Sequence, residues 1–136
     1  MLGWQFKQEL EQVHTVHDLA RHLERFLNSG YAVRRQPNGA LVLLPDTVAL
    51  EPFQSFTLEL LADDHHGKYF RVKGKELDAA FDVFDCSLLR GAVKRKVGSL
   101  IVYWHGMVRS KLIDLWSMTH AHIGATHGQR LLFKKG

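Results

Sequence analysis

Residues 15–44, TVHDLARHLERFLNSGYAVRRQPNGALVLL, join a helical pattern to a hairpin pattern and so decide the fold class. Apolar residues recur at helical spacing over 16–28, after a threonine, Thr15, that is suited to cap the first turn. Two strand-like segments, 31–36 and 40–44, then flank Pro-Asn-Gly, which is typical of tight turns. A helix followed by an antiparallel hairpin indicates an α+β protein.

The next segment repeats the hairpin pattern. Apolar and polar residues alternate over 56–60, and again over 68–73, on either side of a polar turn at 63–67. The alternation in the second strand places two apolar residues on the inner side and three residues on the outer side: Tyr69, Arg71 and Lys73.

The rest of the chain predicts a second amphipathic helix over 76–90, a buried central strand over 99–104 and a last helix over 110–120. The basic end, 124–136, is expected to be a partly loose tail. We therefore expect a single α+β domain over 1–136, with a mostly antiparallel sheet of four to six strands (two hairpins plus the central strand) and about three helices packed against it.

Positive charge is concentrated in the last third of the sequence. From Arg90 to Gly136 there are nine Lys or Arg and one acid, which gives a charge of +8. Residues 1–89 carry nine bases and thirteen acids, a charge of −4, and the two parts sum to the net charge of +4. Such asymmetry indicates contact with a polyanion.

The leading hypothesis is a small non-enzymatic accessory protein that binds nucleic acid, DNA or RNA, electrostatically through its basic C-terminal third. Cations on a loop and on a helix can neutralise phosphates, and an aromatic residue between cations can stack on bases. The residues expected to do so are Lys94, Arg95, Lys96, Arg109 and Lys111, with Tyr69, Arg71 and Lys73 as secondary contacts and Arg34 and Arg35 as an extension. The alternative for the same charges is an ordinary solvated surface.

Opposite charge on separate segments also suits a protein-interaction module that docks a partner or a second copy of the chain. A minor alternative is a metal-dependent hydrolase. Its ligands would be the aspartates of the predicted helix 76–90 or the histidines near the carboxyl end: Asp78, Asp82 and Asp85, or His120, His122 and His127.

Two histidines at i and i+2 share a face only on an extended segment. On a helix His120 and His122 diverge by about 160°, so we expect no metal site there, and we expect His120 to lie beside Trp116. The three histidines of the first predicted helix are expected on its solvated polar side: His14, His17 and His22.

The single cysteine, Cys86, cannot form an intramolecular disulfide, and its neighbour Asp85 disfavours a reactive thiolate. The sequence lacks a P-loop, a Gly-x-Ser-x-Gly elbow and a His-Glu-x-x-His motif, so no cofactor and no catalytic residue are assigned. The apolar runs are much shorter than the roughly 20 residues that span a bilayer. We expect a cytoplasmic protein without a membrane span.

Overall fold

The computed structural model describes residues 4–46 and 55–127, with side chains through residue 120, and shows an α+β fold. Three α-helices, one short 3-10 helix and six strands occur in these ranges. Their order along the chain is α1 (Trp4–Glu9), η1 (Leu10–Gln12), α2 (Val16–Leu27), β1 (Tyr31–Arg35), β2 (Leu41–Pro45), β3 (Thr57–Asp63), β4 (Gly67–Lys73), β5 (Asp78–Asp82), β6 (Leu88–Ala92) and α3 (Arg95–His127).

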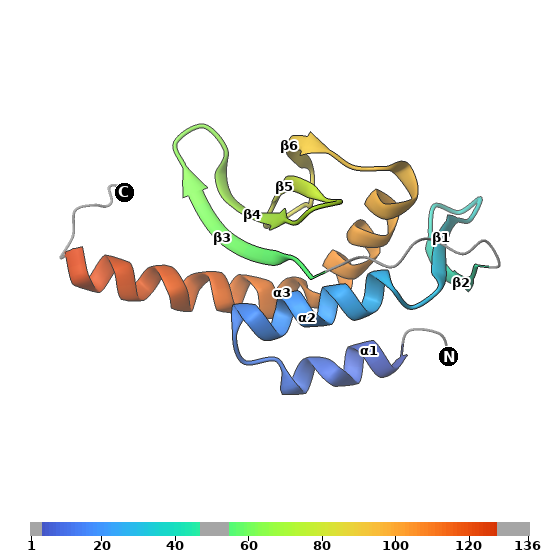
Figure 1. Ribbon diagram of the computed structural model, residues 1–136, viewed down its shortest axis with the longest axis horizontal. Coiled ribbons are helices and arrows are strands. Elements are labelled where there is room, and N and C mark those ends of the chain that lie inside the picture. The colour runs from blue at the N-terminus through green and yellow to red at the C-terminus, as the bar shows by residue number, and fades with distance from the viewer. Residues whose placement is uncertain (1–3, 47–54, 128–136) are drawn as a thin grey trace.

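The strands form two antiparallel sheets, a β1–β2 hairpin and a four-stranded sheet in the order β3-β4-β5-β6. The larger sheet curves away from α3, which runs beneath it (Figure 1). Helix α2 contacts both α3 and β3, and α1 packs on α2. The β1–β2 hairpin contacts α3 and lies beside its first turns (Figure 1). This arrangement leaves the start of α3 between the small hairpin and the larger sheet.

One core joins the helices to the larger sheet. Trp104 of α3 is fully buried, and its ring lies 6.2 Å from that of Phe70 on β4. Two further side chains fasten α3 to the sheet: the Trp116 indole donates to the Leu61 carbonyl at 3.0 Å, and Nε2 of His105 lies 2.7 Å from the Val83 carbonyl. These bonds satisfy polar groups that burial would otherwise make costly.

The prediction of helix 16–28 and of both hairpins is confirmed. Thr15 caps α2 in a capping box, because its hydroxyl accepts from the Asp18 N–H at 3.0 Å and the Asp18 carboxylate accepts from the Thr15 N–H at 3.1 Å. In the second hairpin Leu60 pairs with Phe70, and the turn is closed by Gly67 at φ +71°.

The prediction of a helix over 76–90 is wrong, because the segment forms β5, a turn and β6. The turn is held by Asp82, whose carboxylate accepts from the N–H groups of Phe84 (2.7 Å) and Asp85 (3.1 Å). Such local side-chain bonds compete with helix formation. Since β5 lies inside the sheet, consecutive residues such as Ala79, Ala80 and Phe81 are all buried. The segment therefore lacks the alternation of a half-buried strand, and its apolar residues also fit a helical spacing.

The predicted central strand 99–104 and the predicted helix 110–120 are both parts of α3. The strand prediction is wrong because a short apolar run has the same appearance in a buried helix as in a central strand. The helix continues through His127, and 128–136 lie outside the described residues, so the loose tail over 124–136 stays a prediction. No helix in the described ranges has the length and hydropathy that crossing a bilayer requires.

The prediction that His22 faces solvent is also wrong, since its side chain is 0% exposed. The short helix α1 and η1, which the sequence analysis did not assign, cover this part of α2, and Nε2 of His22 lies 2.7 Å from the Phe6 carbonyl of α1. A histidine with both ring nitrogens bonded can be buried without an unsatisfied polar group.

Candidate functional site

A groove lies where the β1–β2 hairpin, the β5–β6 segment and the start of α3 meet. Its volume is about 530 Å³, within the usual size range of binding sites. Two arginines, Arg35 and Arg95, line it together with mostly apolar or small residues: Val33, Leu41, Phe81, Cys86, Leu88, Val93, Gly98, Ser99 and Val102. The structure thus brings a cation of the first hairpin to one of the C-terminal third.

Local structure explains why each arginine reaches the groove. Alternation along β1 places Arg35 on the same face as Val33, and Arg35 pairs with Leu41 of β2. Arg95 is the first residue of α3, where unpaired backbone N–H groups add partial positive charge. Both side chains are exposed. The groove therefore combines an apolar lining with positive potential.

One stripe of residues on the outward side of α3 begins in the groove and extends beyond it. Arg95, Ser99, Val102, Gly106 and Arg109 recur at i, i+4, i+7, i+11 and i+14, so on a regular helix they share a face about 80° wide. At 1.5 Å per residue, Arg95 and Arg109 are about 21 Å apart along the axis. A Cβ built on Gly106 would meet nothing within 4 Å, so the backbone is bare there.

At the far end of this stripe Arg109 holds the β5–β6 turn. Its Nε donates to the Phe84 carbonyl at 2.8 Å, and its guanidinium carbon lies 6.0 Å from the centre of the Phe84 ring. Nζ of Lys68 lies 5.9 Å from the same ring and 4.5 Å from the Trp116 ring, on which His120 stacks at 3.6 Å. Two cations therefore flank an exposed phenylalanine.

The other predicted cations of the C-terminal third do not all gather here. Lys94 is exposed beside Arg95, whereas Lys96 forms an ion pair with Asp46. Lys111 is about 160° from Arg95 around the helix and so faces another direction. The predicted set is therefore divided between at least two faces of α3.

The secondary set lies on the sheet face that points away from α3. Arg71 forms a bidentate pair with Asp78, with both N–O distances at 3.0 Å, and is 3.8 Å from Glu59. The hydrogen bonds that Arg71 donates to Asp78 raise the pKa of Arg71, and the same bonds lower the pKa of Asp78. Tyr69 is only 9% exposed, and Lys73 is exposed. The ring and the guanidinium are therefore engaged within the protein.

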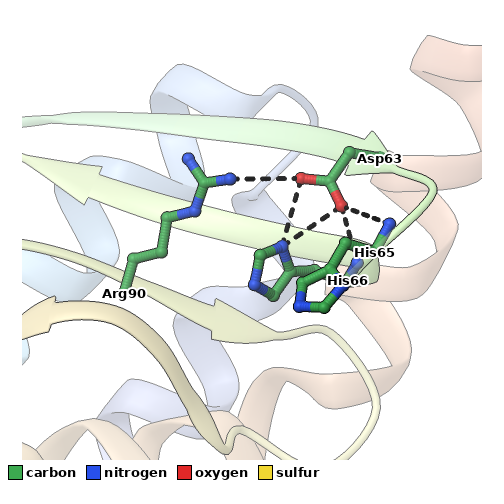
Figure 2. Close-up of polar contacts among 4 residues, drawn as sticks. All are labelled: Asp63, His65, His66 and Arg90. Carbon is green, nitrogen blue, oxygen red and sulfur yellow. Dashed lines mark hydrogen bonds and ion pairs between the residues drawn. The ribbon is translucent and has the colours of Figure 1, made fainter.

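The β3–β4 turn carries a small charged cluster around Asp63 (Figure 2). Its carboxylate accepts from the backbone N–H groups of His65 (3.0 Å) and His66 (2.6 Å) and lies 3.2 Å from Nδ1 of His66. Arg90 of β6 reaches the same carboxylate at 3.6 Å. The His66 backbone bond is the main cause that lowers the pKa of Asp63. This cluster shapes the turn and connects it to β6.

The described residues do not support either proposed metal site. Within them, no three His, Cys, Asp or Glu side chains converge as metal ligands. Asp78 and Asp82 lie on a strand, so the helical stripe of aspartates does not exist. His120 stacks on Trp116 as predicted, while the side chains of His122 and His127 lie outside the described part.

Cys86 lines the groove but is buried. Burial, with smaller contributions from Asp85 and Asp82, raises the pKa of its thiol to about 12. The thiolate needed for nucleophilic attack is therefore disfavoured at neutral pH. The backbone at Cys86 has φ +61°, which is part of the tight β5–β6 turn.

Comparison with protein-family models, with curated proteins and with solved structures gives no match to this chain. The function is therefore argued from the geometry of the groove and of the α3 stripe.

Proposed function

We propose that this protein is a non-enzymatic interaction module that binds an acidic, partly apolar polypeptide segment in the groove between the β1–β2 hairpin and α3. The observation that carries the proposal is the groove itself, which Arg35 and Arg95 line together with mostly aliphatic residues. Apolar side chains of a partner would fill the groove, while its carboxylates would pair with the guanidinium groups. The single buried cysteine suits a reducing, cytosol-like compartment.

Binding of nucleic acid is the second candidate. It is supported by four exposed cations at one end of the molecule: Arg34, Arg35, Lys94 and Arg95. It is weakened by the pairing of Lys96 with Asp46 and of Arg71 with Asp78, and by the burial of Tyr69. The aliphatic groove lining also suits protein side chains better than bases, which prefer aromatic platforms.

Selection from a displayed library of random peptides tests the first candidate. The wild-type protein serves as bait, and the variant Arg35→Glu/Arg95→Glu serves for counter-selection. We expect enriched peptides that carry both acidic and apolar residues and bind the double variant at least about tenfold more weakly. Lys75→Glu, which changes an exposed cation outside the groove lining, is the matched control. Absence of enrichment, or equal binding by the double variant, would contradict the proposal.

Fluorescence anisotropy with DNA and RNA oligonucleotides, over about 50 to 200 mM salt, tests the second candidate. If phosphates are bound, affinity falls steeply with salt and is lost when Lys94, Arg95 and Lys96 are all reversed to Glu. Binding of oligonucleotides, without enrichment of any peptide, would replace the first candidate by the second.

A further inference from the structure

We propose that the groove and the outward stripe of α3 form one docking surface, and that its occupant is an amphipathic α-helix of a partner protein with acidic residues at both ends. The inference rests on the proposed function and specifies its partner. It adds the part of the surface beyond Val102, with Gly106 and Arg109, that the groove alone does not include.

Exposed apolar side chains gather on this surface. Five large hydrophobic side chains of the described residues are exposed, and three of them lie here: Phe84 (44%), Leu88 (48%) and Val102 (43%). Leu88 and Val102 line the groove, and Phe84 is held beside Arg109, seven residues further along α3 than Val102. A concentration of exposed apolar groups between charged residues is typical of interaction sites.

Cations bracket the apolar part at both ends. Arg35 and Arg95 stand at the start of the stripe, and Lys68 and Arg109 flank Phe84 at its end. The path of about 21 Å along α3 corresponds to the rise of about fourteen residues, or four turns, of a second helix. A partner helix with one acidic group at each end would place both carboxylates within reach of these cations.

The shape of the surface favours a helix over an added strand. The exposed face lies along a helix, and Gly106 lets a second helix approach at the usual interaxial distance of about 8 to 10 Å. The nearby free edge, β6, is short, has an irregular register at Ala80/Phe81 and includes Gly91 at φ +79°. Such features discourage strand addition.

Charge argues against a second copy of this chain as the occupant. If two copies packed stripe to stripe, a parallel alignment would oppose Arg95 to Arg95, and an antiparallel alignment would oppose Arg95 to Arg109. Both alignments place like charges in contact. A partner with acidic ends has the complementary charge.

Synthetic helical peptides test the inference. The probe is an alanine-based peptide of about 18 residues with two glutamates fourteen positions apart and leucines on the same face between them. One matched peptide carries lysine in place of both glutamates, and a second carries proline at its centre. We expect the glutamate peptide to bind in fluorescence anisotropy, and Arg95→Glu and Arg109→Glu each to weaken it at least about tenfold. Lys75→Glu should leave binding unchanged.

A charge exchange gives the sharper result. A peptide with lysine at one end only should regain affinity for either Arg95→Glu or Arg109→Glu, not both, which also fixes the orientation of the helix.

If the proline peptide binds equally well and depends on Arg95 alone, the occupant is extended, so the helical inference fails while the proposed function stands. If the helical probe does not bind, or binds irrespective of charge, the inference is wrong. A salt-resistant dimer in light scattering would instead make a second copy the occupant.

Discussion

His22 joins three helices through one buried imidazole. The indole Nε1 of Trp104 donates to Nδ1 of His22 at 3.0 Å. Because an indole can only donate, Nδ1 must be unprotonated, so Nε2 carries the hydrogen and donates to the Phe6 carbonyl. Burial lowers the pKa of His22 below its usual value of 6.5. The folded protein therefore holds His22 neutral, in one tautomer.

This imidazole should make stability depend on pH. Below about pH 6.5 the unfolded chain binds a proton that folded His22 excludes, so stability falls as the pH is lowered, by at most about 1.4 kcal/mol per pH unit. In His22→Gln the amide can accept from Trp104 and donate to Phe6 without titrating. We expect the variant to lose about 1–2 kcal/mol at pH 7 and to show a smaller slope. Urea unfolding from pH 5 to 8 measures both, and equal slopes would refute the assignment.

At the scale of the element, β6 depends on one glycine. Gly91 has φ +79°, and a Cβ there would lie 2.3 Å from the Asp78 carbonyl oxygen and 3.0 Å from the Cα of Ala79. Both backbone strain and a clash with β5 therefore exclude a side chain. Gly106 of α3 is the opposite case, since a Cβ there would meet nothing within 4 Å.

The two glycines form a matched pair of tests. Gly91→Ala should destabilise the protein by about 2–4 kcal/mol, because β6 can no longer pair with β5 in its present register. Gly106→Ala should stabilise it by about 0.5–1 kcal/mol through helix propensity. Equilibrium unfolding in urea measures both changes. A tolerated Gly91→Ala would mean that β6 is not held as described.

Local sequence patterns predicted the elements whose signals are complete within a few residues. Thr15 with Asp18, and the polar turns of the two hairpins, act on their immediate neighbours, so α2 and β1 to β4 were assigned correctly. The segment 99–104 was misread because its burial comes from Phe70 and other distant residues, not from its own period. Segment 76–90 was misread because pairing with β4 overrides its helical spacing.

At the scale of the whole molecule, buried residues from α1 to α3 belong to one core cluster. Trp104 lies inside it, in contact with residues of α2 and β4. The candidate groove depends on this common packing, because Arg35 and Arg95 are 60 positions apart in sequence and no local pattern connects them. Charge asymmetry alone pointed to the C-terminal third but not to the hairpin that completes the groove.

A shared core should unfold in one step. We expect urea unfolding curves from far-UV circular dichroism and from tryptophan fluorescence to coincide, since loss of α3 removes the packing of the sheet as well. Trp104→Phe, which keeps a large ring but removes the donor to His22, should shift both curves together by about 1–2 kcal/mol. Separate midpoints for the two probes would show that the sheet and the helices unfold independently.

The position of α3 after the six described strands has a consequence for biosynthesis. A ribosome completes the whole β3–β6 sheet before it adds the first turn of α3, at about 5–20 residues per second. During that interval Phe70 has its ring partner Phe81 of β5 but neither Trp104 nor His105, because these two belong to α3. The nascent sheet thus presents its apolar face to chaperones, and the native fold can form only after α3 has been translated and has left the exit tunnel.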